Sequence, residues 1–558
     1  MGHNQRLDAY HFYEKEWNDY DHLHDSFEWE VPSAFNMADY VCDRWADERG
    51  RVALFATDGD GRERTYTFWE LRNLTNRLAN YLADHGVGRG DRVGVNAPQK
   101  PETLITHIAA WKLGAVSIPL STLFGIDGLS YRLADSESVA CVVDESNVET
   151  LRTVRDDLDT LETVLTVDVD EPEDDETDIW DAMERSSRDR DIVETDAEDD
   201  AIIIYTSGTT GNPKGVLHAH RMLLGHLPLF LTSFCNLDVR ETDVAWTPSE
   251  WAWVASLFDI VFPALYYGRP IVAYEGGPFD PEAAFRTVER YGVSIFFAPP
   301  TALRMMMNVD SPADRYDVDS VRVIPSGGES LGQSIVEWGE TTFDGAAVHE
   351  AYGQTEANLT IGDCTALTEF REGKMGLGGP GHDVRIVNPE TAEPTVEDGD
   401  VGEIAVRYEG DPVCFKEYLN RPEKTERKVR NGWLLTEDLG KRDEDGYITF
   451  VSRTDDVIIS SGYRIGPEEI EESLAGHESV ADSAVVGVPD DERGEIPKAF
   501  IVLADGYDPD DALVDELQSY VKERLAKYEY PREIQFLDEL PKTTTGKIRR
   551  ADLREAEP

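Results

Sequence analysis

Short apolar stretches rich in β-branched residues alternate with segments of helical periodicity along most of the chain, and this alternation restricts the fold more than any other feature. The apolar stretches include residues 92–96, 201–205, 293–297 and 321–324. Strands that are apolar on both faces are typical of parallel sheets, because helices cover such sheets on both sides. The pattern therefore predicts an α/β fold with mostly parallel sheets covered by helices.

Two helices can be placed from their end signals. In the first, Thr67 and Glu70 have the spacing of a capping box, leucines recur on one helical face, and Gly86 is a typical stop. The second is expected over residues 465–474, where Pro467 precedes two glutamates in the first turn. A strand is expected to follow over residues 483–488.

The pattern changes beyond Gly402, where shorter strands and hairpin-like turns predict a β-rich subdomain. A polar stretch at residues 453–456 separates two apolar strands, and we place the domain boundary there. We expect a large N-terminal domain of residues 1–454 and a small, mobile α+β C-terminal domain of residues 455–558. The acidic segment 168–200 is expected to be a solvated surface excursion of the first domain.

The chain is strongly acidic, since 53 Lys and Arg residues stand against 111 Asp and Glu residues, giving a formal charge of −58. Nucleic-acid binding and docking on an anionic membrane both need clustered Lys and Arg, so this balance argues against them. The carboxylates are spread along the whole chain. We therefore interpret the acidity as adaptation to concentrated salt, with binding of cationic partners as the alternative.

The cysteines and the apolar runs predict a cytoplasmic protein. The 5 cysteines are far apart and lack metal-ligand spacing, which indicates a reducing compartment. The longest apolar run, residues 253–268, is interrupted by Asp259 and Pro263, and no apolar leader follows Met1. We expect no stable membrane insertion, and a homo-oligomer stays an open alternative.

The strongest chemical signal is the sequence IYTSGTTGNPKGV at residues 204–216, directly after an apolar stretch. Its glycines and hydroxyl side chains can turn N–H and O–H groups onto phosphate oxygens, and Lys214 adds a positive charge. It is not a Walker A loop, because Gly215 follows Lys214. The GxGxxG match at residues 376–381 is not interpreted as a dinucleotide site, because Pro380 lacks an N–H and a strand is expected after it.

Further motifs follow in a fixed order: SGGE at 326–329, EAYGQTE at 350–356, TEDLG at 436–440, SRTDD at 452–456, SGYRIGP at 461–467 and PKTTTGKI at 541–548. Together they resemble the adenylate-forming superfamily of AMP-forming acyl-CoA synthetases. The likeness is closest to the medium-chain members, through YGQTE, YRIGP, the RGE at 493–495 and the KAFIV at 498–502. The resemblance implies that ATP, Mg²⁺ and a carboxylic acid give acyl-AMP and pyrophosphate, and that the acyl group then passes to coenzyme A.

The resemblance also implies residues for the nucleotide. Those expected to hold the triphosphate are Thr206, Ser207, Gly208, Thr209, Thr210, Gly211 and Lys214. Those expected around the adenine are Gly327, Gly328, Glu329, Glu350, Ala351 and Tyr352, and Gly353 and Gln354 are also expected to bind the nucleotide.

The resemblance assigns the remaining adenylation roles to single residues. Thr355 is expected to donate to the α-phosphate and Glu356 to bind Mg²⁺, a cation that prefers oxygen ligands. Asp438 is expected to accept from the ribose hydroxyls, with Arg453 beside the ribose and phosphate. Lys547 is expected to bridge the substrate carboxylate and the α-phosphate.

For the second half-reaction the resemblance implies rotation of the small domain about Asp455. Gly462 would then leave room for pantetheine, and Arg464 is expected to act in both states. The residues expected to contact CoA are Ser461, Gly462, Tyr463, Arg464, Arg493, Lys522 and Arg532. For the last three, surface cations in ion pairs are the alternative.

The expected acid is a medium-chain or branched fatty acid. Acetate-specific relatives have Trp where this chain has Gly353, so a pocket deeper than acetate is expected, lined by Trp253. Trp251 and Ala252 either narrow this pocket or, for Trp251, pack in the core. The alternatives are an aryl-CoA ligase for benzoate-like acids and an adenylation domain that loads a separate carrier protein.

Overall fold

The computed structural model describes residues 6–206, 213–275, 277–394, 397–454, 456, 458–460, 463–490, 493–504, 506–524, 530–542 and 548–555. The chain divides into two compact units, one of residues 1–384 with 406–434 and one of residues 385–405 with 435–558. Asp455, at the predicted domain boundary, lies outside the described residues. The boundary after Thr454 therefore stays a prediction.

The first unit contains two large sheets. The central strands of each sheet are parallel, and antiparallel strands are added at the edges. One runs in the order β19-β9-β8-β4-β3-β5-β6-β7, with parallel pairing from β8 to β7. Its strands are β3 (Arg92–Asn96), β4 (Val116–Pro119), β5 (Ala140–Asp144), β6 (Thr163–Val167), β7 (Glu176–Asp178), β8 (Asp200–Thr206), β9 (Lys214–Ala219) and β19 (Glu417–Tyr418).

The other sheet of this unit runs in the order β16-β15-β14-β13-β12-β10-β11-β1-β2, with parallel pairing from β14 to β1. Its strands are β1 (Val52–Thr57), β2 (Glu63–Thr67), β10 (Ala245–Trp246), β11 (Ile271–Tyr274), β12 (Ile295–Phe296), β13 (Val323–Gly327), β14 (Ala347–Gln354), β15 (Ala357–Gly362) and β16 (Leu377–Gly378). The predicted α/β class with mostly parallel sheets is confirmed.

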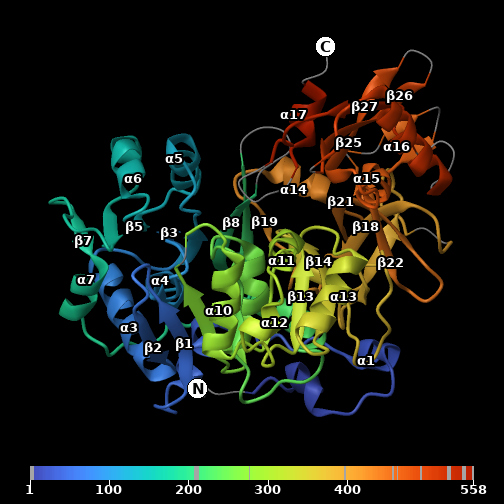
Figure 1. The fold of residues 1–558 in the computed structure, drawn as a ribbon. Helices are drawn as coiled ribbons and strands as arrows, with labels where there is room; N and C mark the ends of the chain where they lie inside the picture. The colour runs from blue at the N-terminus through green and yellow to red at the C-terminus, as the bar shows by residue number, and fades with distance from the viewer. Residues whose placement is uncertain are drawn as a thin grey trace. The chain divides into compact units, whose positions relative to one another are not determined.

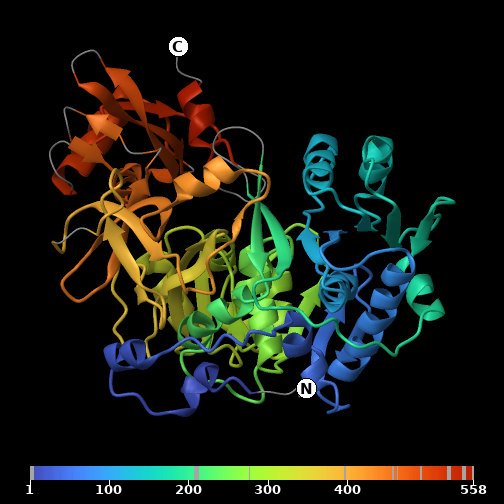
Figure 2. The same cartoon turned by 180° about the vertical axis from the view of Figure 1, so that it is seen from behind.

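Helices α3 (Phe68–Asp84) and α4 (Pro101–Lys112) lie against each other beside β1, β2 and β3 (Figure 1). The predicted capping box is present, because the Thr67 hydroxyl accepts from the Glu70 N–H and the Glu70 carboxylate accepts from the Thr67 N–H. The N-terminal segment, dark blue in Figure 2, is held to the same unit where Tyr20 donates to the Gly378 carbonyl and Trp29 to the Gly381 carbonyl.

The acidic segment 168–200 is not only a solvated excursion. It contains β7 and helix α7 (Ile179–Arg185), which buries Ile179, Ala182 and Met183 in the main core. These three residues form a narrow helical stripe that the acidic composition hides, so the prediction of a purely solvated segment was wrong.

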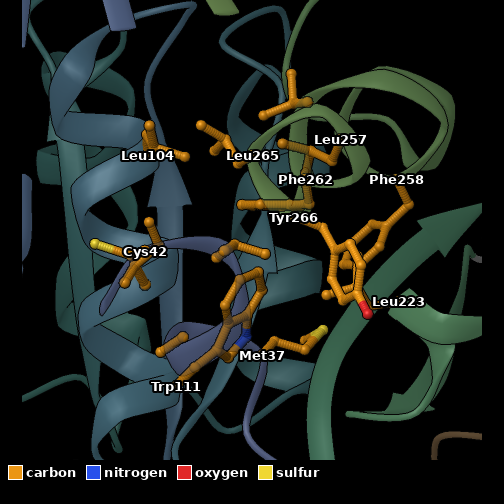
Figure 3. Close-up of a cluster of buried hydrophobic side chains, with 14 of the residues drawn as sticks. Met37, Cys42, Leu104, Trp111, Leu223, Leu257, Phe258, Phe262, Leu265 and Tyr266 are labelled. Atoms are coloured by element: carbon orange, nitrogen blue, oxygen red, sulfur yellow. The ribbon is translucent and has the colours of Figure 1, made fainter. Parts of the chain in front are cut away.

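The longest apolar run is part of a buried core (Figure 3). It forms the π-helical segment η5 (Ala255–Val261) and helix α9 (Phe262–Tyr266). Phe262 contacts Trp111 of α4 with ring centroids 4.8 Å apart, and it contacts Phe258 at 5.1 Å. In the part of the chain that the structure describes, none of the helices combines the length and apolarity needed to cross a bilayer.

The β-rich part expected beyond Gly402 is a sheet in the order β17-β18-β21-β20, with β22 beside β21, and β21 pairs antiparallel with both β20 and β22. Its strands are β17 (Val384–Val387), β18 (Gly402–Arg407), β20 (Val429–Arg430), β21 (Trp433–Arg442) and β22 (Ile448–Arg453). Because β17 follows the GxGxxG match, the helix that a dinucleotide fingerprint requires is replaced by a strand, as expected.

The second unit contains a sheet in the order β24-β23-β26-β25, with β27 parallel to β26. Its strands are β23 (Ile458–Ser460), β24 (Tyr463–Ile465), β25 (Val480–Asp490), β26 (Gly494–Leu503) and β27 (Glu533–Phe536), and its helices are α15 (Pro467–Ala475), α16 (Asp511–Arg524) and α17 (Arg550–Glu555). The predicted helix at residues 465–474 and strand at residues 483–488 correspond to α15 and β25.

Candidate active site

The expected phosphate-binding segment connects two adjacent antiparallel strands. Thr206 ends β8, Lys214 begins β9, and the two residues are paired in the register of the sheet. The segment between them is thus closed at its base. Ser207, Gly208, Thr209, Thr210 and Gly211 lie outside the described residues.

The expected adenine-binding residues come from the ends of two neighbouring strands. Parallel strands β13 and β14 place Gly327 opposite Ala351. A Cβ atom at Gly327 would lie 2.3 Å from the Ala351 carbonyl oxygen, and Gly328 has a φ of +89°, so both positions require glycine. The SGGE motif therefore lets the two strand ends approach closely. The Glu329 carboxylate is bound by two residues of α11 (Pro300–Met307): Thr301 donates to it at 2.8 Å, and Arg304 pairs with it at 3.2 Å.

Strand β14 then carries the EAYGQTE motif and turns back into β15. Ala351 pairs with Gly362 and Tyr352 with Ile361, and the register shifts between Tyr352 and Gln354. The backbone N–H of Glu350 donates to Asp363 at 3.0 Å, and burial raises the pKa of that carboxyl to about 7. These contacts fix the backbone of the motif.

Thr355 and Glu356 are held by residues of other strands. The His218 Nε2 lies 2.7 Å from the Thr355 carbonyl oxygen. Burial lowers the pKa of His218 to about 4, so the imidazole is neutral at pH 7 and donates its Nε2–H to this carbonyl. The hydroxyl of Tyr418, on β19, donates to the Glu356 carboxylate.

The Glu356 carboxylate is buried and yet kept ionised. Burial alone would raise its pKa, but Lys428, the Tyr418 hydroxyl and Lys214 favour the charged form and lower the pKa below its usual value. Lys428 is itself buried, and Lys214 Nζ lies 4.7 Å from the centre of the Tyr418 ring. Glu356, Tyr418, Lys428 and Lys214 thus form one charged group next to the phosphate-binding segment.

This carboxylate fits the expected Mg²⁺ site. It offers hard oxygen ligands in their ionised form, as Mg²⁺ requires. Within the described ranges, no group of three or more His, Cys, Asp and Glu side chains is arranged to hold a metal. Mg²⁺ bound at Glu356 would therefore share its coordination with phosphate oxygens and water, as is common for this ion.

Tyr418→Phe tests whether the hydroxyl stabilises this buried charge. We expect the free energy of unfolding to fall by about 1–3 kcal/mol, because the Glu356 carboxylate loses a donor without gaining water. Urea unfolding in molar KCl measures it. Tyr408→Phe is the matched control, since it removes a hydroxyl that donates to the Lys416 carbonyl at a half-buried site. An equal or larger loss in the control would contradict the special role of Tyr418.

The residues expected around the acyl group occupy different environments. Trp253 is half-buried, with its ring centroid 6.3 Å from that of Phe124, whereas Trp251 is 1% exposed and belongs to the main core. The packing alternative for Trp251 is thus confirmed. A Cβ atom at Gly353 would lie 2.3 Å from the Leu359 amide nitrogen, so this glycine is required by the close approach of β14 and β15. The space beside Gly353 is therefore filled by β15, and the expected acyl pocket at this residue stays a prediction.

A buried polar pair lies next to Gly353. The amide of Asn358 donates to the Asp259 carboxyl, and burial raises the Asp259 pKa well above its usual range. The sequence gives a signal for Asp259, because this residue interrupts the apolar run 253–268. Tyr418 and Lys428 had no such signal, because an isolated Tyr or Lys matches no motif.

In the second unit, Asp438 and Arg453 face each other on paired strands. They occupy opposite positions in the register of β21 and β22, and Arg453 Nη1 lies 3.6 Å from Asp438 Oδ1. Asp438 is buried and Arg453 is partly exposed. The two side chains predicted to meet the ribose and phosphate are therefore neighbours.

The residues expected to contact CoA are brought together only in part. Arg532 donates to the Tyr530 hydroxyl at 3.0 Å, and Lys522 Nζ lies 3.9 Å from the centre of the same ring. Arg493 pairs with Asp490 at 3.8 Å, which agrees with the ion-pair alternative. Lys547, Asp455, Ser461, Gly462 and the side chains of Tyr463 and Arg464 lie outside the described residues.

Comparison with known proteins identifies the class. Residues 42–419 match the family described as AMP-binding enzyme, and residues 469–547 match the AMP-binding enzyme C-terminal domain. The chain therefore belongs to the family of AMP-binding enzymes.

Similar proteins narrow this to acyl-CoA synthetases. The chain is 34% identical over 553 residues to the mitochondrial acyl-coenzyme A synthetase ACSM3 of Mus musculus, covering 97% of this chain and 94% of that protein. An acyl-CoA synthetase of Brucella canis has a similar structure, with a TM-score of 0.75, 32% identity and coverage of 97% and 99%. The anthranilate CoA ligase AuaEII with anthranoyl-AMP has a TM-score of 0.85, 27% identity and coverage of 94% and 98%. The protein is an AMP-forming acyl-CoA ligase.

Proposed function

We propose that the protein activates a medium-chain or branched fatty acid with ATP and transfers the acyl group to coenzyme A. The observation that carries the ATP-dependent activation is the charged group at residue 356, where a buried, ionised carboxylate is held near Lys214 at the base of the phosphate-binding segment. The medium-chain acid is supported by the sequence likeness to ACSM3. A carboxylate is a poor acyl donor until it is adenylated, and phosphoryl chemistry depends on positioning and charge neutralisation.

In the first half-reaction, we assign the nucleotide to the residues that the motifs indicate. Lys214 and the segment after Thr206 bind the triphosphate, and Thr355 donates to the α-phosphate. Glu356 would hold Mg²⁺, which when bound neutralises phosphate charge. The neutral His218 keeps the Thr355 backbone in place. Asp438 and Arg453 take the ribose and α-phosphate side, and Lys547 binds the acid carboxylate and the α-phosphate as they react.

In the second half-reaction, the thiol of CoA attacks the acyl carbonyl and AMP leaves. We assign CoA to Ser461, Gly462, Tyr463, Arg464, Arg493, Lys522 and Arg532, with the small domain turning about Asp455. Support for part of this set is the pairing of Lys522 and Arg532 at one aromatic ring, which leaves two cations in a fixed position for phosphate groups.

An aryl-CoA ligase is the second candidate. The likeness to an anthranilate CoA ligase and the half-buried Trp253 favour it, because an aromatic acid would stack on an indole. A panel of straight-chain acids from two to twelve carbons and of aromatic acids, assayed with ATP, Mg²⁺ and CoA in molar KCl, separates the two. We expect the highest kcat/KM for a medium-chain or branched acid. A benzoate-like acid with the highest value would favour the aryl-CoA ligase instead.

The acidity is proposed to be an adaptation to salt. ATP, CoA and the acid are all anions, so a net charge of −58 repels them at low ionic strength rather than steering them. Even buried cations have surplus carboxylates, as at Lys100, which pairs with Asp144, Asp168 and Glu275 at 2.6–2.9 Å. A cytoplasmic location stays a prediction.

Dialysis from molar KCl to low salt should therefore reduce both stability and activity. Repulsion among the carboxylates is screened over about 3 Å at 1 M salt and over about 30 Å at 0.01 M. Circular dichroism during thermal unfolding and the ligase assay, each at both salt concentrations, measure the change. Sodium sulfate at equal ionic strength is the control for a specific potassium effect. Full activity and an unchanged melting temperature at low salt would contradict the adaptation.

A further inference from the structure

The residues on either side of positions 543–547, where Lys547 lies, are joined to each other. The Arg549 N–H donates to the Pro541 carbonyl at 2.8 Å, and Lys542 and Ile548 form an antiparallel bridge. Residues 541–542 and 548–549 are thus fixed to each other on either side of residues 543–547. We call these four residues the base of the Lys547 segment, and their position depends on what anchors the helix that follows, α17.

Helix α17 is anchored by the apolar side chain of Leu553 and by ion pairs. Leu553 packs in a small core with Val486 and Phe500 of strands β25 and β26. Arg550, the first residue of the helix, pairs through Nη2 with Glu471 of α15 at 2.6 Å. Its Nη1 lies 3.6 Å from the Asp456 carboxylate. The Arg550 side chain is only 15% exposed, so these pairs are shielded from solvent.

The Asp456 carboxylate pairs with both arginines of α17. Arg554 donates to Asp456 Oδ1, while Arg550 faces Oδ2. Asp456 directly follows Asp455, the residue that we assign as the hinge. One carboxylate next to the hinge is therefore tied to both ends of the helix that follows the lysine segment.

Further carboxylates lie near the Arg550 guanidinium. Besides Asp456, the carboxylates of Glu468 and Glu471 on α15 face it, and it favours their ionised forms. Burial outweighs this effect and raises the Glu468 pKa to about 8. Arg550 thus interacts with three carboxylates, and a planar guanidinium can join two of them in a fixed geometry that a lysine cannot reproduce.

We propose that Arg550 is a positioning residue for the adenylation step: by joining Asp456 and Glu471, it ties the base of the Lys547 segment to the hinge. The inference rests on the proposed function, since it assumes that Lys547 and Asp455 have the roles assigned above. Arg550 itself is not assigned a contact with substrate. Its effect would be exerted through Arg549, which it follows directly and whose N–H is bound to the Pro541 carbonyl.

The test separates the two half-reactions in the full-length enzyme. Arg550→Met and Asp456→Asn are each assayed for ATP–pyrophosphate exchange with the best acid, and for conversion of supplied acyl-AMP and CoA to thioester. Exchange should fall by about 10- to 100-fold, because a misplacement of about 1 Å costs that much, while thioester formation stays within about twofold. The double variant should lose less exchange than the two single losses combined would give, since both changes remove the Arg550–Asp456 pair. Arg550→Lys should restore exchange only in part.

The matched control is Arg549→Met. Arg549 is the adjacent arginine, just before α17; it is exposed and pairs with Asp552 of that helix at 3.1 Å, so both half-reactions should be unchanged. Thermal unfolding of each variant is measured alongside the assays. If Arg550→Met does not fold, Asp456→Asn is the variant to assay, because it keeps the Arg550–Glu471 pair. Equal loss of both half-reactions, or unchanged exchange in Asp456→Asn, would overturn the positioning role. Lack of ligase activity in the unmodified enzyme would instead reject the proposed function.

Discussion

Lys547→Ala should abolish most of the first half-reaction and spare the second. We expect ATP–pyrophosphate exchange to fall by about 100- to 1,000-fold, the usual cost of removing one preorganised donor from a developing charge. The ammonium group would neutralise the carboxylate and the α-phosphate as they approach, and no other lysine stands in residues 543–548. Acyl-AMP supplied with CoA no longer needs this step, so its conversion to thioester should continue.

The control for Lys547→Ala is Lys542→Ala. Lys542 lies in the same motif but pairs with Asp482 of β25 at 2.8 Å in an exposed position, so its loss should change exchange by only about twofold. Radiolabelled pyrophosphate exchange and thioester detection by mass measure the two steps. Equal loss of both half-reactions in Lys547→Ala would remove its assigned role.

Gly462→Leu should give the opposite pattern. Because we assign this glycine to the channel for pantetheine, a leucine side chain would fill the space through which the thiol reaches the acyl carbonyl. Thioester formation from acyl-AMP should fall by about 100-fold, while ATP–pyrophosphate exchange stays close to that of the unmodified enzyme. The expected result is an enzyme that makes acyl-AMP and holds it.

A graded series is the control for Gly462→Leu. Gly462→Ala adds one methyl group and should give an intermediate loss of thioester formation, with a raised KM for CoA. Single-turnover mixing of preformed acyl-AMP with CoA measures both variants. If CoA turnover is intact in Gly462→Leu, pantetheine does not pass this residue.

Much of the fold could be predicted because local and long-range signals agree. The capping box at Thr67 fixed the start of α3, and the apolar stretch 92–96 is β3. Periodicity and turn chemistry are properties of neighbouring residues, so a single sequence reveals them. The prediction failed at α7, where only a narrow apolar stripe is buried within an acidic segment.

The candidate site could be predicted where its residues are neighbours in a sequence motif. The motif residues at 327 and 351 lie opposite each other, and those at 438 and 453 do the same. The residues that hold Glu356 could not be predicted, because Tyr418 and Lys428 are distant in sequence and belong to no motif. Likewise the meaning of Gly353 depends on the close approach of β15, which only tertiary structure provides.

The reaction that we assign to this protein couples an acid to free CoA through an acyl adenylate. The most direct measurement is the initial rate of AMP release with ATP, Mg²⁺ and the best acid in molar KCl, with and without free CoA, while the thioester is followed by mass. We expect sustained AMP release to require both the acid and CoA, with one thioester formed per AMP. AMP release that is independent of CoA, or no thioester with any acid of the panel, would contradict it.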